Sequence, residues 1–142
     1  MACARQAYRN VRDDKEAEAM IVKTRSDVKG TKGEARGDKW HSLRLLLEED
    51  GMGVSLVDGV LEPGFDMILW QKNHLEACYC IEGEGLVEEL ESGRVHEIKA
   101  GTLYAMNNHD RHRIRAITRM RVICTFVPPL TGGEIHDADG SL

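Results

Sequence analysis

The sequence predicts an all-β domain, folded as a barrel or a double-sheet roll. Short apolar stretches recur along the chain, and turns rich in glycine separate them. No strong helical periodicity occurs from Met20 onward. These observations favour about nine or ten short strands. A small barrel of this kind can hold one small ligand in its interior.

The length of 142 residues indicates one domain with a real core. Residues 1–19 are polar and poor in large apolar side chains, and we expect them to form a short flexible N-terminal extension. The apolar pattern begins at Met20, so residues 20–142 are assigned to the barrel.

Each expected strand lies between turn signals. The Pro63-Gly64 turn and the glycines at 51, 53, 83, 85, 93 and 101 mark the connections, and Pro128-Pro129 ends the last strand. The expected strands cover residues 21–24, 40–47, 54–60, 65–71, 74–81, 86–90, 94–98, 102–106, 111–116 and 119–126.

The stretch from 73 to 85 is the centre of the prediction. Strand alternation places His74 and Glu76 on one face, and Cys78 and Cys80 continue that face. One end of this strand therefore carries two possible ligands, while its apolar remainder can line a pocket.

Composition excludes several classes of protein. The net charge of −5 argues against a nucleic-acid partner. No apolar run reaches membrane-spanning length and no signal-peptide pattern opens the chain, so we expect a cytoplasmic protein without a membrane partner. The four cysteines show no metal-ribbon or disulfide spacing, which favours reduced, buried thiols.

Two hairpins supply the candidate metal ligands, which are His74, Glu76, Tyr104, His109 and His112. The arrangement resembles the two short motifs of the cupin superfamily, whose fold is a double-stranded β-helix barrel (jelly roll). Gly64, His74, Glu76 and Gly83 fall near the first motif, and Gly101 and Tyr104 near the second. The usual three-histidine, one-glutamate set is absent.

Several longer runs together are similar to the ectoine synthase family of cupins. They are residues 45–53, 73–77, 80–85, 101–105, 109–112, 128–132 and 134–137, and the resemblance extends from Met20 to Gly140. It implies a lyase (a hydro-lyase) that closes N-γ-acetyl-L-2,4-diaminobutyrate into ectoine with loss of water. Ectoine is a compatible solute made under osmotic stress, and the family usually forms homodimers.

The resemblance also implies roles for single residues. Iron, Fe(II) or another divalent metal, would be held by Glu76, Tyr104 and His112, a hard and oxygen-rich set that suits iron. The substrate pocket would contain Trp40, Arg44, His74, Cys124, Phe126, Glu134 and His136. Of these, Glu134, His74 and His136 would act in catalysis, as base or proton relay. Arg44 would bind the substrate carboxylate.

The sequence also departs from the family. Gly59 stands where relatives usually have threonine and Gln71 where they have tyrosine, and relatives commonly continue beyond Leu142. Two alternatives therefore stay open: a cupin enzyme acting on another N-acetylated amino acid, for example by amide hydrolysis, and a non-catalytic cupin that binds a small molecule. The segment that contains Pro128-Pro129 is the expected lid.

Overall fold

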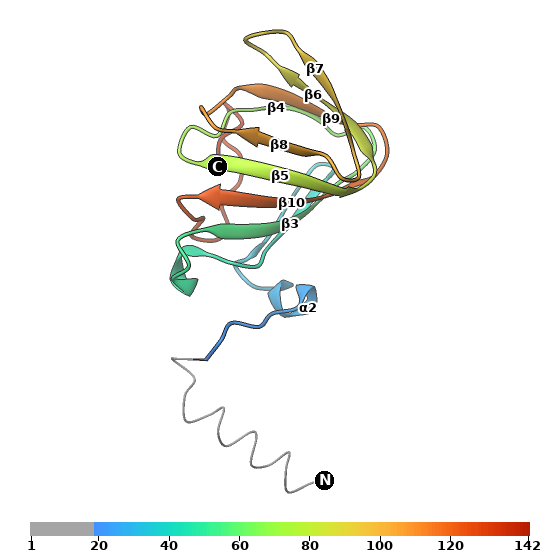
Figure 1. Ribbon diagram of the computed structural model, residues 1–142. Helices are drawn as coiled ribbons and strands as arrows, with labels where there is room; N and C mark the ends of the chain where they lie inside the picture. The colour runs from blue at the N-terminus through green and yellow to red at the C-terminus, as the bar shows by residue number, and fades with distance from the viewer. Residues whose placement is uncertain (1–18) are drawn as a thin grey trace, which may run out of the picture.

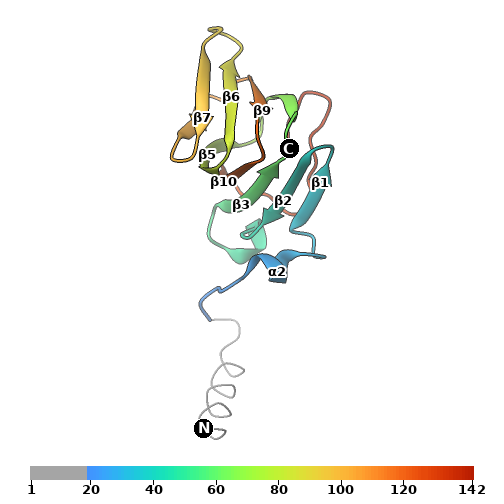
Figure 2. The ribbon, with the colours of Figure 1, turned by 90° about the vertical axis from the view of Figure 1, so that its right-hand side faces the viewer.

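The computed structural model describes residues 19–142. The predicted N-terminal extension, residues 1–19, therefore lies outside the described residues except for Ala19. Figures 1 and 2 show two β-sheets that form a barrel, with a short helix below one of them. No helix among residues 19–142 is both long and apolar enough to cross a membrane.

The predicted all-β fold is confirmed. The six-stranded sheet has the order β1-β2-β3-β10-β5-β8 and the four-stranded sheet the order β4-β9-β6-β7, and all neighbours are antiparallel. The strands are β1 (Glu34–Gly37), β2 (Trp40–Arg44), β3 (Ser55–Leu61), β4 (Asp66–Leu69), β5 (Leu75–Glu82), β6 (Glu84–Glu89), β7 (Val95–Lys99), β8 (Leu103–Met106), β9 (His112–Ala116) and β10 (Met120–Val127).

The core lies between the two sheets. Cys80 and Met120 contribute fully buried side chains from the larger sheet, and Val87 and Ile114 contribute from the smaller one. Burial of apolar surface on facing sheets is the main driving force for this architecture. The strands next to the core are therefore fixed in register, since a shift by one residue would expose their apolar face.

Strand β5 follows the predicted alternation. His74, Glu76, Cys78 and Cys80 are buried, whereas Leu75 and Tyr79 are exposed. The turn into β6 requires glycine at position 83, because its φ is +89° and a Cβ there would lie 2.0 Å from the carbonyl oxygen of Arg119. The side chains of Glu76, Cys78 and Cys80 therefore lie on the inner face of β5.

The predicted strand over residues 21–24 is wrong. Ile21 and Val22 are exposed and pair with no strand in the described part of the chain. Thr24 instead caps helix α2 (Arg25–Val28): its hydroxyl accepts from the N–H of Asp27, and the Asp27 carboxylate accepts from the N–H of Thr24. This reciprocal capping box starts a helical turn where the apolar run alone suggests a strand.

One strand was not predicted. Strand β1 is polar and lacks apolar alternation. It forms by antiparallel pairing with β2, in which Glu34 lies opposite Leu43 and Gly37 opposite Trp40. The turn between them places Lys39 at a φ of +60°. A short 3-10 helix, η2 (Glu48–Asp50), occupies the turn before β3.

Candidate active site

A cavity opens inside the barrel, and both sheets line it. Strand β2 contributes Trp40 and Arg44, and β10 contributes Cys124 and Phe126. The cavity has a volume of about 90 Å³, which leaves room for several water molecules or part of a small ligand. The predicted site residues on its wall are Trp40, Arg44, Glu76, Tyr104, His112, Cys124, Phe126 and His136.

The three predicted metal ligands reach this cavity from different strands. Glu76 lies on β5, and Tyr104 on β8 pairs with Cys78, two residues further along β5. His112 begins β9 of the opposite sheet, and its ring centroid lies 6.4 Å from that of Tyr104. The fold thus brings a carboxylate, a phenol and an imidazole to the wall of one cavity.

Burial determines the protonation of these groups in the metal-free protein. It raises the pKa of Glu76 to about 7 and raises that of Tyr104 well above its ordinary range. It lowers the pKa of His112, so this imidazole stays neutral. The Nδ1–H of His112 donates to the carbonyl of Asp110 at 3.0 Å, which leaves the Nε2 lone pair free to act as a ligand.

This donor set fits a divalent metal ion of the harder kind. A carboxylate and a phenol offer oxygen ligands, and the neutral imidazole offers nitrogen. Deprotonating Glu76 and Tyr104 in a buried site without a cation is costly, whereas a bound cation would stabilise both anions. The residues present are therefore compatible with a metal centre.

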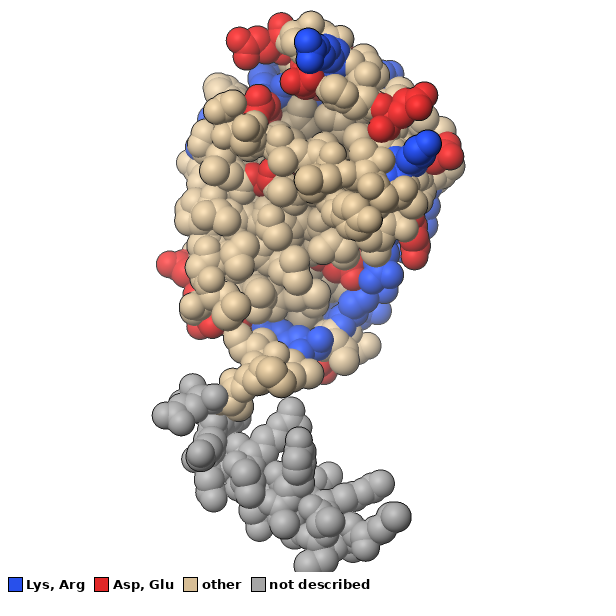
Figure 3. Space-filling view, viewed as in Figure 1, with Lys and Arg blue, Asp and Glu red and all other residues tan. Residues whose placement is uncertain are grey.

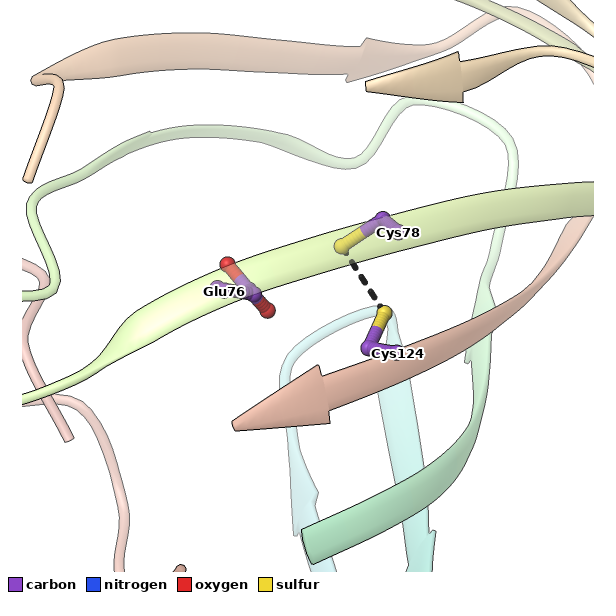
Figure 4. Close-up of side chains that lie close together, drawn as sticks. All are labelled: Glu76, Cys78 and Cys124. Carbon is purple, nitrogen blue, oxygen red and sulfur yellow. Dashed lines mark hydrogen bonds between the residues drawn. The ribbon is translucent and has the colours of Figure 1, made fainter. Parts of the chain in front are cut away.

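Two thiols lie beside Glu76 (Figure 4). The Sγ atoms of Cys78 and Cys124 are 2.9 Å apart, and both thiols are free and buried. Within residues 19–142, one group of three side chains of the histidine, cysteine, aspartate or glutamate type has candidate ligand atoms all within 4.8 Å of one another. This group is Glu76, Cys78 and Cys124. Strand alternation predicts the direction of Cys78, but its contact with Cys124 depends on the β5–β10 register, which the sequence does not reveal.

Arg44 is a buried cation with unused hydrogen-bonding capacity. Its Nη2 donates to the carbonyl oxygen of Glu134, and its Nη1 lies 3.7 Å from the Glu134 carboxylate. Neither Nε nor Nη1 has a hydrogen-bond partner. Since buried polar groups are normally satisfied, these two donors indicate a place for an anionic ligand group.

Glu134 lies behind Arg44 and does not line the cavity. Its carboxylate accepts hydrogen bonds from the N–H groups of Thr131 and Gly132 at 2.7 Å and 2.6 Å. Burial acts to raise its pKa, but these hydrogen bonds and the charge of Arg44 together lower it. Glu134 is therefore a stable carboxylate in the folded protein.

His136 lines the cavity next to Trp40, with ring centroids 5.3 Å apart in an edge-on arrangement. Burial, together with the charge of Arg44, lowers its pKa, and its Nδ1 is buried without a hydrogen-bond partner. A neutral imidazole with a free ring nitrogen at a cavity wall can take up a proton.

His74 and His109 lie outside the cavity lining. The Nδ1–H of His74 donates to the carbonyl of Pro128 at 2.7 Å, and the ring packs edge-on against Phe126 at a centroid distance of 5.8 Å. His109 is exposed and donates from Nδ1 to the carbonyl of Gln71 at 2.8 Å. The structure therefore separates His109 from the other candidate ligands.

The two departures from the family pattern occupy different places. Gly59 lines the cavity, and a Cβ there would make ordinary contacts, the nearest at 3.4 Å to Cγ2 of Val122. Gln71 is buried beside the cavity, and its Oε1 accepts from the N–H of Leu142 at 2.9 Å. Leu142 itself lines the cavity, which the sequence does not predict.

Solved structures with this fold include cupins. An RmlC-like cupin from Shewanella frigidimarina superposes with a TM-score of 0.57 at 22% identity, covering 67% of this chain and 81% of that chain, a likeness of fold alone. Ectoine synthase from P. lautus superposes with a TM-score of 0.78 at 46% identity, covering 85% and 87%. The two-sheet barrel with its internal cavity is thus that of a cupin.

Sequence comparison narrows this class. The family model described as ectoine synthase matches residues 20–142. L-ectoine synthase from Desulfosudis oleivorans is 52% identical over 123 residues, 86% of this chain and 95% of the relative. The enzyme of the same name from Halalkalibacterium halodurans is 50% identical over 121 residues, 85% and 94%. The chain belongs to the ectoine synthase family.

Proposed function

We propose that the protein is a lyase that closes N-γ-acetyl-L-2,4-diaminobutyrate into ectoine with release of water, a step in compatible-solute synthesis under osmotic stress. Family membership over residues 20–142 supports this reaction. The observation that carries it in the structure is the buried guanidinium of Arg44, whose Nε and Nη1 have no partner. The substrate carries a carboxylate that would accept from an unpartnered donor of this guanidinium.

The substrate ammonium group requires a negative partner near Arg44. The lowered pKa of Glu134 keeps this side chain as a carboxylate, and it lies within 3.7 Å of Arg44. An amino acid presents its carboxylate and ammonium groups side by side, so the Arg44–Glu134 pair matches both charges. Because Glu134 does not line the cavity, its carboxylate would have to leave its backbone hydrogen bonds to contact the substrate ammonium.

The reaction balances within the substrate. The α-nitrogen bonds to the acetyl carbon and gives up two protons, and the acetyl oxygen leaves as water with two protons. His136 is the proposed proton acceptor, since its Nδ1 is free at the cavity wall. His74 is the proposed relay, and it would act from outside the cavity lining. Trp40 and Phe126 exclude bulk water, which favours a dehydration.

Iron is the proposed metal, held by Glu76, Tyr104 and His112. When bound, a divalent ion supplies Lewis acidity that polarises an amide carbonyl. The support from the chain is its donor chemistry, because two acidic oxygens and a neutral imidazole face one cavity.

Product formation tests the proposal. Iron-loaded protein is incubated with N-γ-acetyl-L-2,4-diaminobutyrate, and ectoine is followed by chromatography beside a Glu76→Ala variant. We expect ectoine from the parent protein and at least a hundredfold less from the variant. Acetate in place of ectoine would favour amide hydrolysis. No product from folded, iron-loaded protein would refute the proposed reaction and favour an enzyme that acts on another N-acetylated amino acid.

A homodimer is the proposed assembly. The outer face of β8, β5 and β10 carries few charged side chains in Figure 3, and exposed Leu75, Tyr79, Leu103 and Val127 lie on these strands. An apolar patch of this kind on a soluble enzyme favours association with another protein. We further propose a cytoplasmic location, where Cys78, Cys80 and Cys124 would stay reduced.

A further inference from the structure

The proposed ring closure assigns no proton transfer or metal binding to the two thiols beside Glu76, yet they converge on the same point of the cavity. Cys78 and Cys124 are register partners on β5 and β10, and all three side chains line the cavity wall. Their candidate ligand atoms lie within 4.8 Å of one another, and Figure 4 shows Glu76 and Cys78 on β5 with Cys124 beside them on β10.

The spacing of the sulfurs is close to what a metal ion requires. At 2.9 Å the two Sγ atoms are well beyond a disulfide bond of about 2.05 Å. Tetrahedral coordination with metal–sulfur distances of about 2.3 Å would place them about 3.8 Å apart. Both cysteines therefore need to separate by less than about 1 Å, which side-chain rotation on adjacent strands can provide.

We propose that Glu76, Cys78 and Cys124 form a second binding site, which takes a thiophilic divalent ion such as Zn²⁺ or Cd²⁺. On binding, each thiol releases its proton to solvent, and the ion gains two thiolate sulfurs and one carboxylate oxygen. A fourth position faces the cavity and is available to water. The two thiolates distinguish this site from the proposed iron site, in which Glu76 is joined by Tyr104 and His112. Sulfur ligands select softer metal ions than oxygen and nitrogen ligands do.

The sharing of Glu76 has a consequence that rests on the proposed function. Both ligand sets use the carboxylate of Glu76, so we expect a thiophilic ion and iron to compete for it. Zinc or cadmium bound at the thiols would also occupy the cavity next to Cys124 and Phe126, where substrate is proposed to bind. The site would therefore make the enzyme sensitive to inhibition by thiophilic metals.

Cadmium titration of metal-free protein tests the site directly. The protein carries Cys3→Ser, so that the remaining thiols are Cys78, Cys80 and Cys124. Binding is followed by ultraviolet thiolate-to-cadmium charge transfer and by native mass spectrometry. We expect one tightly bound Cd²⁺, at least tenfold weaker binding in Cys78→Val or Cys124→Ser, and weaker binding when the protein is preloaded with Fe²⁺.

Cys80 provides the matched control. It is fully buried on the same strand, but its Sγ donates to the carbonyl of Glu82 and it does not line the cavity. Cys80→Val should keep the charge-transfer band, with folding of all variants checked by circular dichroism. The site is refuted if the band persists in the Cys78→Val/Cys124→Ser double variant, or if it depends on Cys80. The cadmium titration contains no substrate, so it tests the site independently of the proposed reaction. If the protein shows the cadmium band but forms no ectoine in the separate product assay, only the proposed reaction is refuted.

Discussion

At the scale of single residues, Glu76 is the most informative side chain. It is a carboxylic acid on the inner face of a strand, among two thiols, a phenol and apolar walls. Burial without a cation raises its pKa from an ordinary 4.5 to about 7. The same burial that makes the anion unfavourable makes it a strong ligand once a metal ion enters, so this residue links stability to metal binding.

This shift predicts a pH dependence for the metal-free protein. Between about pH 4.5 and pH 7 the folded state holds a proton on Glu76 that the unfolded state gives up, so the contribution of Glu76 to stability falls as pH rises, by on the order of 3 kcal/mol, and levels off above pH 7. The lowered pKa values of His112 and His136 act in the opposite direction, so the slope due to Glu76 is the difference between the parent protein and a variant without this carboxyl group. Glu76→Gln should abolish this slope and be the more stable protein at pH 8. Urea unfolding at pH 5 and pH 8, after chelation of metal, measures both.

Glu97→Gln is the control, because Glu97 is exposed on β7 and does not line the cavity. It should retain the slope of the parent protein. An unchanged slope in Glu76→Gln would show that another group causes the pH dependence.

Much of the site could be predicted residue by residue. Alternation along one strand placed His74, Glu76 and Cys78 on a common face, and motif resemblance singled out Tyr104 and His112. Two features could not be predicted: Arg44 keeps donors without a partner, and the Glu134 carboxylate accepts hydrogen bonds from backbone N–H groups. They depend on how a C-terminal loop lies against β2, which no local pattern encodes.

At the scale of elements, the C-terminal segment determines how the cavity is closed. Residues 137–142 run along residues 68–73: the N–H of Trp70 donates to the carbonyl of Gly140, and the N–H of Lys72 to the hydroxyl of Ser141. An ion pair between Lys72 and Asp139 at 2.7 Å adds to these contacts. The segment therefore holds Leu142, and with it one wall of the cavity, in place.

Gly140→Ala should disturb this closure. The φ of Gly140 is +76°, and a Cβ would lie 2.3 Å from the carbonyl oxygen of Ile68, so the segment must shift. We expect KM for the acetylated substrate to rise about tenfold and the C-terminal segment to become more sensitive to proteolysis, while iron content stays unchanged.

The matched control is Gly93→Ala in the β6–β7 hairpin. Its φ is also +76°, but a Cβ there would contact nothing within 4 Å. It carries the same backbone strain without the clash, so its KM should stay near that of the parent. Equal kinetic effects in the two variants would argue that the segment does not shape the cavity.

The strands themselves differ in how well sequence predicts them. Strands with a buried apolar face, such as β5 and β10, were found within one or two residues, because alternation reports burial directly. Strand β1 was missed since its residues are polar and it forms only by pairing with β2. The prediction of a strand at residues 21–24 is wrong because the apolar side chains of this run are exposed.

At the scale of the whole molecule, the outer face of β8, β5 and β10 is the proposed dimer surface. Leu103 is 63% exposed on β8, the edge strand of this face, with Tyr79 opposite it in the β5–β8 register. Leu103→Glu should convert the dimer into a monomer, since a buried and unpaired carboxylate in an apolar interface is costly. Light scattering over a concentration series measures the mass.

Ile117→Glu is the control for this variant. Ile117 is similarly exposed, at 58%, but it lies in the turn between β9 and β10. It should leave the mass unchanged. A monomeric parent protein, or a Leu103→Glu variant that stays dimeric, would place the contact elsewhere or remove it.

The alternation of β5 has a consequence for how this protein can vary. Its even-numbered positions from 76 to 80 face the cavity and core, and Leu75 and Tyr79 face outward on the proposed dimer surface. A complete set of substitutions along this strand, scored separately for metal retention and for assembly, should therefore alternate with a period of two residues. Neighbouring codons would then be under unrelated selection, although the residues they encode are joined by one peptide bond.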